Sequence, residues 1–252
     1  MFWLPIAFLG VAFLYALAGF GGGSTYIALL AIVGLPLTVI PVISLSCNLI
    51  VSGQGAWLLH RAKHVRWTML APLLVGSMPA AFIGGAWRLS GTAFLWVLTL
   101  TLTVAGLALF YQPKSTEESS TPAHWPKVKL FLLGVGLGLV SGLSGIGGGI
   151  FLSPALHLLR WEKARAICSA AAVFIALNSA TGLAGQLTKG VAGLEQMPTY
   201  LLWLCPLAVL VGGRLGTQHL VKKLPAEKIR MITALVVLLV AIRLWLRLLL
   251  RA

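Results

Sequence analysis

Long hydrophobic runs follow one another along this chain, and short polar connections separate them. Six uninterrupted runs have about 20 residues each, the length with which an α-helix crosses ~30 Å of hydrocarbon. Two further runs, 2–34 and 128–159, are interrupted by glycines. The pattern predicts an all-α polytopic membrane protein. The six uninterrupted runs are 37–59, 68–89, 91–111, 166–187, 197–217 and 229–249.

The interruptions read "GFGGGS" at residues 19–24 and "SGIGGG" at residues 144–149. Glycine destabilises a helix interior, so each interruption ends one helical segment before the next begins. The apolar pieces that follow, 24–34 and 150–159, are only ~15 Å long at 1.5 Å per residue, too short to cross a membrane. We interpret them as half-helices.

The second interruption repeats the first 126 positions later, which is half of the 252-residue chain. Each half also carries one asparagine and one glutamine in the apolar run that follows its glycines. Such self-similarity predicts an internal duplication. We expect a first repeat over 1–111, a polar linker over 112–127 and a second repeat over 128–252. The matching polar residues are Asn48 and Gln54 in the first repeat, and Asn178 and Gln186 in the second.

Basic residues predict how the repeats are oriented. If each break turns the chain back, a repeat holds one re-entrant hairpin and three crossings, and the odd number inverts the second repeat. That arrangement places fourteen Lys and Arg on one face and five on the other, whereas four crossings per repeat would split them nine to ten. Because basic residues concentrate on the cytoplasmic side, we expect inverted repeats, a cytoplasmic linker and both termini outside the cytoplasm. The five outer residues would be Arg88, Lys189, Arg243, Arg247 and Arg251.

Composition narrows the class of protein. Hydrophobic residues make up 59% of the chain and charged residues 10%, and the mean hydropathy is +0.96. The net charge of +14 lies in the short connections, so we interpret it as a topology signal and expect a bilayer rather than nucleic acid as the partner. The three cysteines lie in apolar runs without metal-ligand spacing. We therefore expect no metal and no cofactor.

A helix break at membrane depth leaves backbone groups unpaired, and it persists only where protein buries it or water reaches it. The half-helix that follows presents free N–H groups and the positive end of its dipole, which together favour an anion. Two such ends at a repeat interface are typical of secondary transporters. Close helix packing is the alternative role for such glycines, and we favour it for Gly134, Gly138 and Gly142. The candidate substrate-binding residues at the breaks are Gly21, Gly22, Gly23, Ser24, Gly147, Gly148 and Gly149.

Polar side chains on the following runs extend this candidate site. At 100° per residue, Ser44 and Asn48 fall on one face of their predicted helix together with small residues, and Asn178 and Thr181 do likewise in the second repeat. An asparagine amide is costly in lipid and can donate to an anion, whereas Ser and Thr often bond within a helix bundle. The side-chain candidates are Ser44, Asn48, Gln54, Asn178, Thr181 and Gln186.

Carboxylates are scarce in this chain. It contains no Asp, and its five Glu lie in the linker or in connections between apolar runs. A proton or sodium relay on buried carboxylates is therefore not expected. The "GLSG" around Ser144 has no paired histidine, and no strand precedes the glycines as a nucleotide fold requires, so we expect no enzymatic activity.

The paired "GFGGGS" and "SGIGGG" motifs, the Ser- and Asn-bearing run after each, and a length near 250 residues resemble the sulfite exporter TauE/SafE family. The resemblance covers essentially the whole chain. It implies a multi-pass permease of the inner membrane that exports sulfite, sulfonates or other organosulfur anions. A passive anion channel and a non-transporting membrane scaffold are the alternatives. One departure from the family pattern is "GLPLTVIP" in the first repeat, where the second has the basic turn "RWEKAR".

Overall fold

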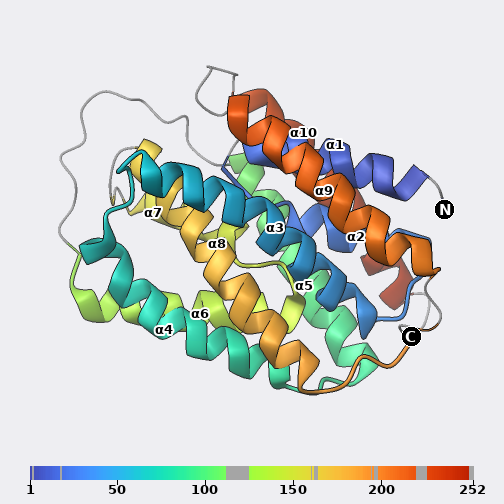
Figure 1. Cartoon of the computed structure of the whole chain (residues 1–252). Coiled ribbons are helices and arrows are strands. Elements are labelled where there is room, and N and C mark those ends of the chain that lie inside the picture. Colours follow the sequence, from blue (N-terminus) through green and yellow to red (C-terminus); the bar gives the residue numbers. More distant parts are fainter. Residues whose placement is uncertain are drawn as a thin grey trace.

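A computed structural model describes residues 1, 3–17, 19–111, 125–159, 161, 164–193, 195, 198–219 and 226–249. This part of the chain contains ten α-helices and no strand (Figure 1). Six of the described helices, α3, α4, α5, α6, α8 and α9, are long and apolar enough to cross a membrane. The predicted all-α membrane fold is confirmed. The helices are α1 (Trp3–Leu17), α2 (Gly23–Val33), α3 (Val39–Arg61), α4 (Trp67–Ala86), α5 (Gly91–Tyr111), α6 (Lys127–Ser144), α7 (Gly149–Leu158), α8 (Ala164–Leu187), α9 (Thr199–His219) and α10 (Ala226–Leu249).

The two predicted half-helices are present. Helices α2 and α7 have 11 and 10 residues and begin one residue before the predicted positions. The helices before them end at glycines in the left-handed region, with φ of 74° at Gly19 and 79° at Gly145. A left-handed glycine is a common helix C-terminus because it has no Cβ to clash with the backbone. The glycine motifs therefore end one helix and start the next.

Each break reverses the chain direction. The indole Nε1 of Trp125, just before α6, donates a hydrogen bond of 2.9 Å to the carbonyl of Leu159, just after α7. The start of α6 and the end of α7 consequently lie together. With 18 residues, α6 is long and apolar enough to cross a membrane, which is longer than one arm of the predicted re-entrant hairpin needs to be. In the first repeat, the ring of Phe8 on α1 stacks on Tyr26 of α2 with centroids 4.7 Å apart.

Helices α3 and α8 occupy equivalent places in the two repeats, and they pack side by side through the middle of the molecule (Figure 1). The amide of Asn48 lies 3.3 Å from the hydroxyl of Ser179. Further along α3, a Cβ placed on Gly55 would lie 3.8 Å from the Cβ of Ala172, an earlier residue of α8. The two helices are therefore antiparallel. This relation between equivalent helices supports our proposal of inverted repeats.

The other main helix pairs also join a helix of one predicted repeat to a helix of the other. Helix α4 packs along α6, and their counterparts α9 and α1 also pack together, while α5 packs on its own counterpart α10. Close approach of α4 and α6 depends on the glycine stripe of α6, whose missing Cβ atoms would overlap carbonyl oxygens of α4. The packing role predicted for these glycines is confirmed. The stripe pairs Gly134 with Leu73, Gly138 with Ser77 and Gly142 with Ala81.

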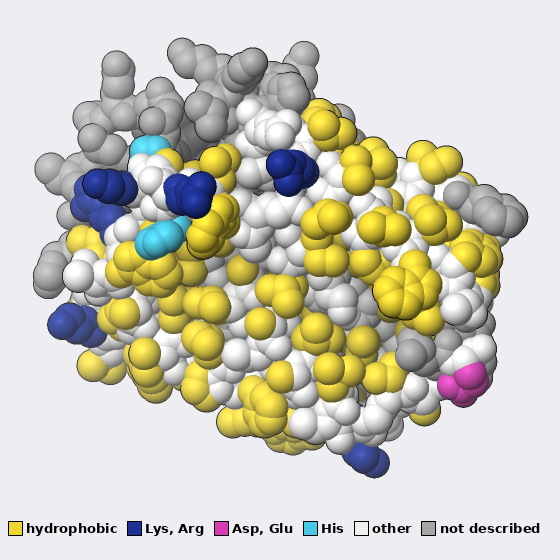
Figure 2. Space-filling model, viewed as in Figure 1, with side chains coloured by type: hydrophobic (Ala, Val, Ile, Leu, Met, Phe, Trp, Pro, Cys, Tyr) yellow, Lys and Arg dark blue, Asp and Glu magenta, His cyan; other side chains and the backbone are white. Residues whose placement is uncertain are grey.

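Apolar side chains cover the middle of the face in Figure 2, and most of the Lys and Arg visible there gather at one edge. On the opposite side of the bundle, Arg88 after α4 donates a hydrogen bond of 3.3 Å to the carbonyl of Lys189 after α8. Burial and the neighbouring Arg88 guanidinium lower the pKa of Lys189. The predicted outer-face residues Arg88 and Lys189 therefore do lie together. Linker residues 112–124, Arg251 and the side chains of Arg243 and Arg247 lie outside the described part.

Candidate functional site

The two glycine breaks meet at Asn48, a buried residue in α3. Its Oδ1 accepts a hydrogen bond of 3.1 Å from the N–H of Gly23, the first residue of α2. Its Nδ2 donates to the carbonyl of Ile146 in the second break at 2.8 Å, and to Ser179 of α8 at 3.3 Å. One amide side chain thus joins both breaks to the helix pair at the centre of the molecule.

Ser44, one helical turn before Asn48, makes a second connection between the breaks. Its hydroxyl lies 3.0 Å from the carbonyl of Gly23 and 2.9 Å from that of Gly145. The single hydroxyl proton is directed at both carbonyl oxygens, and it helps to satisfy that of Gly145, which follows the last residue of α6. Ser44 and Asn48 therefore hold the backbone of both breaks in place.

Close approach to Asn48 explains why glycines occupy this junction. A Cβ on Gly21 would overlap Oδ1 of Asn48, and a Cβ on Gly147 would overlap its Nδ2. On Gly23 it would overlap the carbonyl oxygen of Ile146. Any larger residue at these positions would separate the two breaks.

The middle glycine of each run has a left-handed backbone and lies under an aromatic ring. Gly22 has a φ of 92°, and a Cβ there would lie 3.0 Å from Cζ of Tyr26. Gly148 has a φ of 76°, and a Cβ there would lie 2.9 Å from Cε1 of Phe174. Both the backbone angle and the ring above it disfavour a side chain at these positions.

Backbone N–H groups at both breaks have no acceptor within the described part of the chain. Helix α2 has no side-chain cap at Gly22, and the only capping acceptor is Oδ1 of Asn48 on Gly23. All of these N–H groups belong to buried residues, so water does not replace the missing acceptors at the surface. They are the ordinary binding groups for an anion at a helix N-terminus. The unpaired groups belong to Gly21, Gly22 and Ser24 in the first break, and to Gly147, Gly148, Gly149 and Ile150 in the second.

The surroundings of the breaks are polar but uncharged. Every buried polar side chain among the described residues is Ser, Thr, Asn, Gln or Tyr, and none is an acid or a base. An anion bound here would be held by neutral donors and by the dipoles of α2 and α7.

The structure does not bring all of the predicted residues to the breaks. The amide of Asn178 donates to Ser77 of α4 at 3.0 Å and to its own helix at 2.8 Å. Thr181 bonds only to carbonyls of its own helix. Gln54 donates to the carbonyl of Leu210 in α9, and Gln186 to the carbonyl of Gly142 in α6. Asn178, Gln54 and Gln186 therefore stabilise contacts between helices. The predicted glycines, Ser24, Ser44 and Asn48 gather at one junction.

Sequence reasoning missed Tyr26, Ser141 and Ser179, which lie beside the breaks. Tyr26 is one helical turn after Gly22, and Ser141 one turn before Gly145, so helical spacing from the glycines would have marked both. Ser179 follows Asn178 directly. Its contact with Asn48 joins residues far apart in the sequence, so no local sequence pattern could have predicted it.

The profile of the sulfite exporter TauE/SafE family matches residues 4–244. The chain belongs to this family. It is also 31% identical over 244 residues to "Probable membrane transporter protein y4hK" of Sinorhizobium fredii (strain NBRC 101917 / NGR234), an alignment that covers 96% of each protein. No solved structure matches the chain. The family resemblance seen in the glycine motifs is confirmed, and the protein is a membrane transporter of the TauE/SafE family.

Proposed function

We propose that this TauE/SafE protein is a secondary transporter that exports a small sulfur oxyanion, such as sulfite or a sulfonate, across the cytoplasmic membrane. The observation that carries the proposal is the set of buried backbone N–H groups without acceptors at two uncharged helix breaks. The family description supports an exporter of sulfite, and the relative's name supports a membrane transporter.

A sulfur oxyanion suits this set of donors. Its oxygens accept several hydrogen bonds at once, and a bond to a charged acceptor contributes ~1.5–3 kcal/mol. The dipoles of α2 and α7 add a favourable potential, because both N-termini lie at the breaks. Neutral donors also allow release, since no fixed positive charge pairs with the ligand.

Export needs no coupling carboxylate. The chain has no Asp, and its five Glu lie in connections or in the linker. An anion that leaves an inside-negative cell gains ~2.3 kcal/mol per charge per 100 mV of membrane potential. Electrogenic efflux is therefore consistent with the side chains present, with the linker 112–127 on the cytoplasmic side.

A thermal-shift screen of the purified protein tests the proposal. Sulfite, thiosulfate, sulfoacetate, taurine and simple carboxylates are compared, because a ligand at 100 times its Kd adds ~2.7 kcal/mol to stability. Sulfite or a sulfonate is expected to raise the melting temperature more than a carboxylate of similar size. If no anion raises it, the proposed anion substrate is wrong. Saturable counterflow in liposomes distinguishes the carrier from a passive channel.

A further inference from the structure

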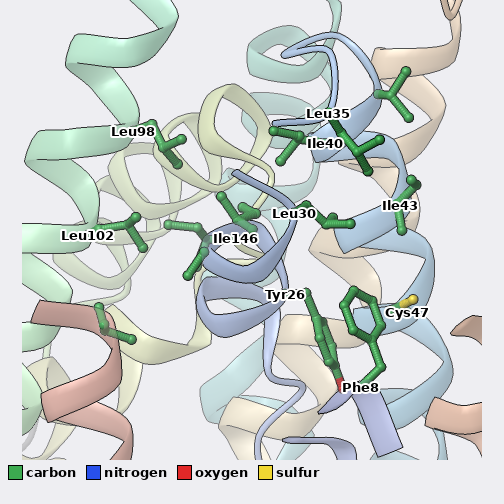
Figure 3. Close-up of a cluster of buried hydrophobic side chains, with 14 of the residues drawn as sticks. Phe8, Tyr26, Leu30, Leu35, Ile40, Ile43, Cys47, Leu98, Leu102 and Ile146 are labelled. Carbon is green, nitrogen blue, oxygen red and sulfur yellow. The ribbon is translucent and has the colours of Figure 1, made fainter. Parts of the chain in front are cut away.

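The hydroxyl of Tyr26 has no hydrogen-bond partner, although the side chain is fully buried. Its ring lies over Gly22, whose Cβ position is 3.1 Å from the hydroxyl oxygen. Figure 3 shows this ring beside Phe8, between α2 and α3. A buried tyrosine hydroxyl normally has a partner, because an unpaired one loses its bond to water without replacement. An unpaired hydroxyl therefore lies next to the free N–H groups of the first break.

The second break has a corresponding group. Ser141 of α6 is also fully buried, and its hydroxyl has no partner. Its Cβ lies 3.2 Å from the Cβ position of Gly148, on the glycine that Phe174 covers. Each break thus combines a left-handed middle glycine, unpaired N–H groups and one unpaired hydroxyl.

Other hydroxyls at the breaks are paired, so the two unpaired ones are exceptions. Tyr15 of α1 lies 2.7 Å from the hydroxyl of Thr25 and 3.2 Å from that of Ser24. Ser144 donates to the carbonyl of Val140 at 2.6 Å and also accepts a bond from a backbone N–H. Tyr15 and Ser144 therefore provide controls whose hydroxyls are paired.

We propose that the hydroxyls of Tyr26 and Ser141 are ligands of two separate anion-binding sites, one beside each break. The first site consists of Tyr26 with the N–H groups of the first break, and the second of Ser141 with those of the second break. This inference rests on the proposed function and extends it from one site at the repeat interface to two. The substrate passes from one site to the other as it crosses the membrane.

The packing of the breaks separates the two sites. Tyr26 belongs to the apolar cluster that includes Phe8 and Cys47, whereas Phe174 belongs to a second cluster with Leu152 and Leu156. Between them lies the Asn48 junction, where the backbones of both breaks are hydrogen-bonded. Tyr26 and Phe174 therefore lie in different apolar clusters, one beside each break.

An anion fits these groups better than a water molecule does. The unpaired N–H groups are donors only, and a hydroxyl can rotate to donate as well. A buried water both donates and accepts, and it needs acceptors among its two to four partners. An oxyanion accepts every bond that these groups offer, so donors gathered in an uncharged site favour it.

Four variants of the full-length protein in detergent test this inference: Tyr26→Phe, Ser141→Ala, Tyr15→Phe and Ser144→Ala. Calorimetric titrations with sodium sulfite under anaerobic conditions, and with sodium methanesulfonate, give affinity and stoichiometry. Melting without ligand gives stability. Wild type is expected to bind two anions per chain. Tyr26→Phe and Ser141→Ala should each weaken one of the two binding events about 10- to 100-fold, the loss of one hydrogen bond to a charged ligand.

Stability distinguishes a ligand-binding hydroxyl from a structural one. Tyr26→Phe and Ser141→Ala remove unpaired groups, so the melting temperature without ligand should stay the same or rise, whereas Tyr15→Phe and Ser144→Ala should lower it. A single bound anion per chain would overturn the two-site inference. Binding unchanged in Tyr26→Phe and Ser141→Ala would mean that water alone occupies these positions. If wild type binds neither anion, the proposed function itself fails.

Discussion

Asn48 is the side chain on which the geometry of both breaks depends. It is 1% exposed, and its amide bonds to Gly23, Ile146 and Ser179. Those three groups come from α2, from the second break and from α8. An asparagine is suited to this position because one planar group presents both an acceptor and two donors. The pair of breaks is thus a single structural unit rather than two independent turns.

Replacing Asn48 by Ala is expected to lower the free energy of unfolding by about 2 kcal/mol. Three hydrogen bonds are lost, and an N–H and a carbonyl remain buried without partners. Thr181→Ala is the control, because this hydroxyl bonds only within α8, and it should cost less than about 0.5 kcal/mol. Thermal unfolding in detergent measures both. Equal losses in the two variants would show that the amide does not hold the breaks together.

Gly22→Ala and Gly148→Ala are expected to reduce anion affinity more than stability. Both positions have positive φ, and an aromatic ring lies closer to the Cβ position than van der Waals contact, so a methyl group should cost at least about 1 kcal/mol of stability. The same group stands beside unpaired N–H donors, where each lost bond to an anion removes ~1.5–3 kcal/mol of binding energy. Affinity for sulfite and melting without ligand are measured together.

Gly136→Ala is the matched control for these two substitutions. A Cβ at Gly136 meets nothing within 4 Å, and its φ is not positive. Affinity and stability should both remain close to wild type. If Gly22→Ala and Gly148→Ala bind sulfite as wild type does, the glycine runs are structural hinges and the anion binds elsewhere.

At the scale of helices, the contact between α4 and α6 depends on glycines rather than on large apolar side chains. The Cβ position of Gly138 lies 2.7 Å from Cα of Ser77. In lipid, burial of apolar groups does not drive helices together, so close backbone packing takes that role. This contact also positions Ser141, which lies one turn along α6, beside the second break.

Gly138→Ala is therefore expected to destabilise the protein, by about 1–3 kcal/mol as for other overpacked contacts. The added methyl group must move α6 away from the backbone of α4. Gly136→Ala, on the exposed face of the same helix, changes helix propensity by the same amount but adds no clash with the backbone of α4. The melting temperature is expected to fall more in Gly138→Ala than in Gly136→Ala. An equal shift in the two variants would mean that the close contact contributes nothing to stability.

At the scale of the molecule, basic residues lie in the connections at both ends of the bundle. The α3–α4 connection follows Arg61, whose guanidinium lies 4.8 Å from the ring of Trp57. At the other end, Arg88 and Lys189 join the α4–α5 and α8–α9 connections. A basic residue beside an exposed tryptophan is typical of the membrane interface. The proposed inverted arrangement would place the first of these ends in the cytoplasm.

Cysteine labelling in intact cells tests this orientation. In a cysteine-free background, Thr188→Cys is expected to react with an impermeant maleimide added outside. Ala62→Cys should react only after permeabilisation, because the proposed inverted repeats would place the α3–α4 and α8–α9 connections on opposite faces. Labelling of both positions from the same side would contradict the inverted arrangement.

The sequence by itself determined the class of protein, the positions of the helices and the existence of two half-helices. These features depend on local properties, namely the length of an apolar run and the glycines that end it. The half-helices begin within one residue of their predicted positions for this reason. The glycine stripe of α6 could also be predicted from the sequence, because a four-residue spacing puts small residues on one face of a helix.

Only the tertiary structure decided which polar residues meet at the breaks. A helix that is apolar all round has no periodicity to mark its buried face, because lipid and protein interior are both apolar. Asn178 therefore looked equivalent to Asn48, with Gln54 and Gln186 as further candidates, yet all three bond to neighbouring helices. Tyr26 and Ser141 gained their roles from contacts with the glycine breaks that form only when the chain folds back. The glycine breaks are therefore visible in the sequence, whereas the polar side chains that contact them are determined by how the two halves of the chain pack together.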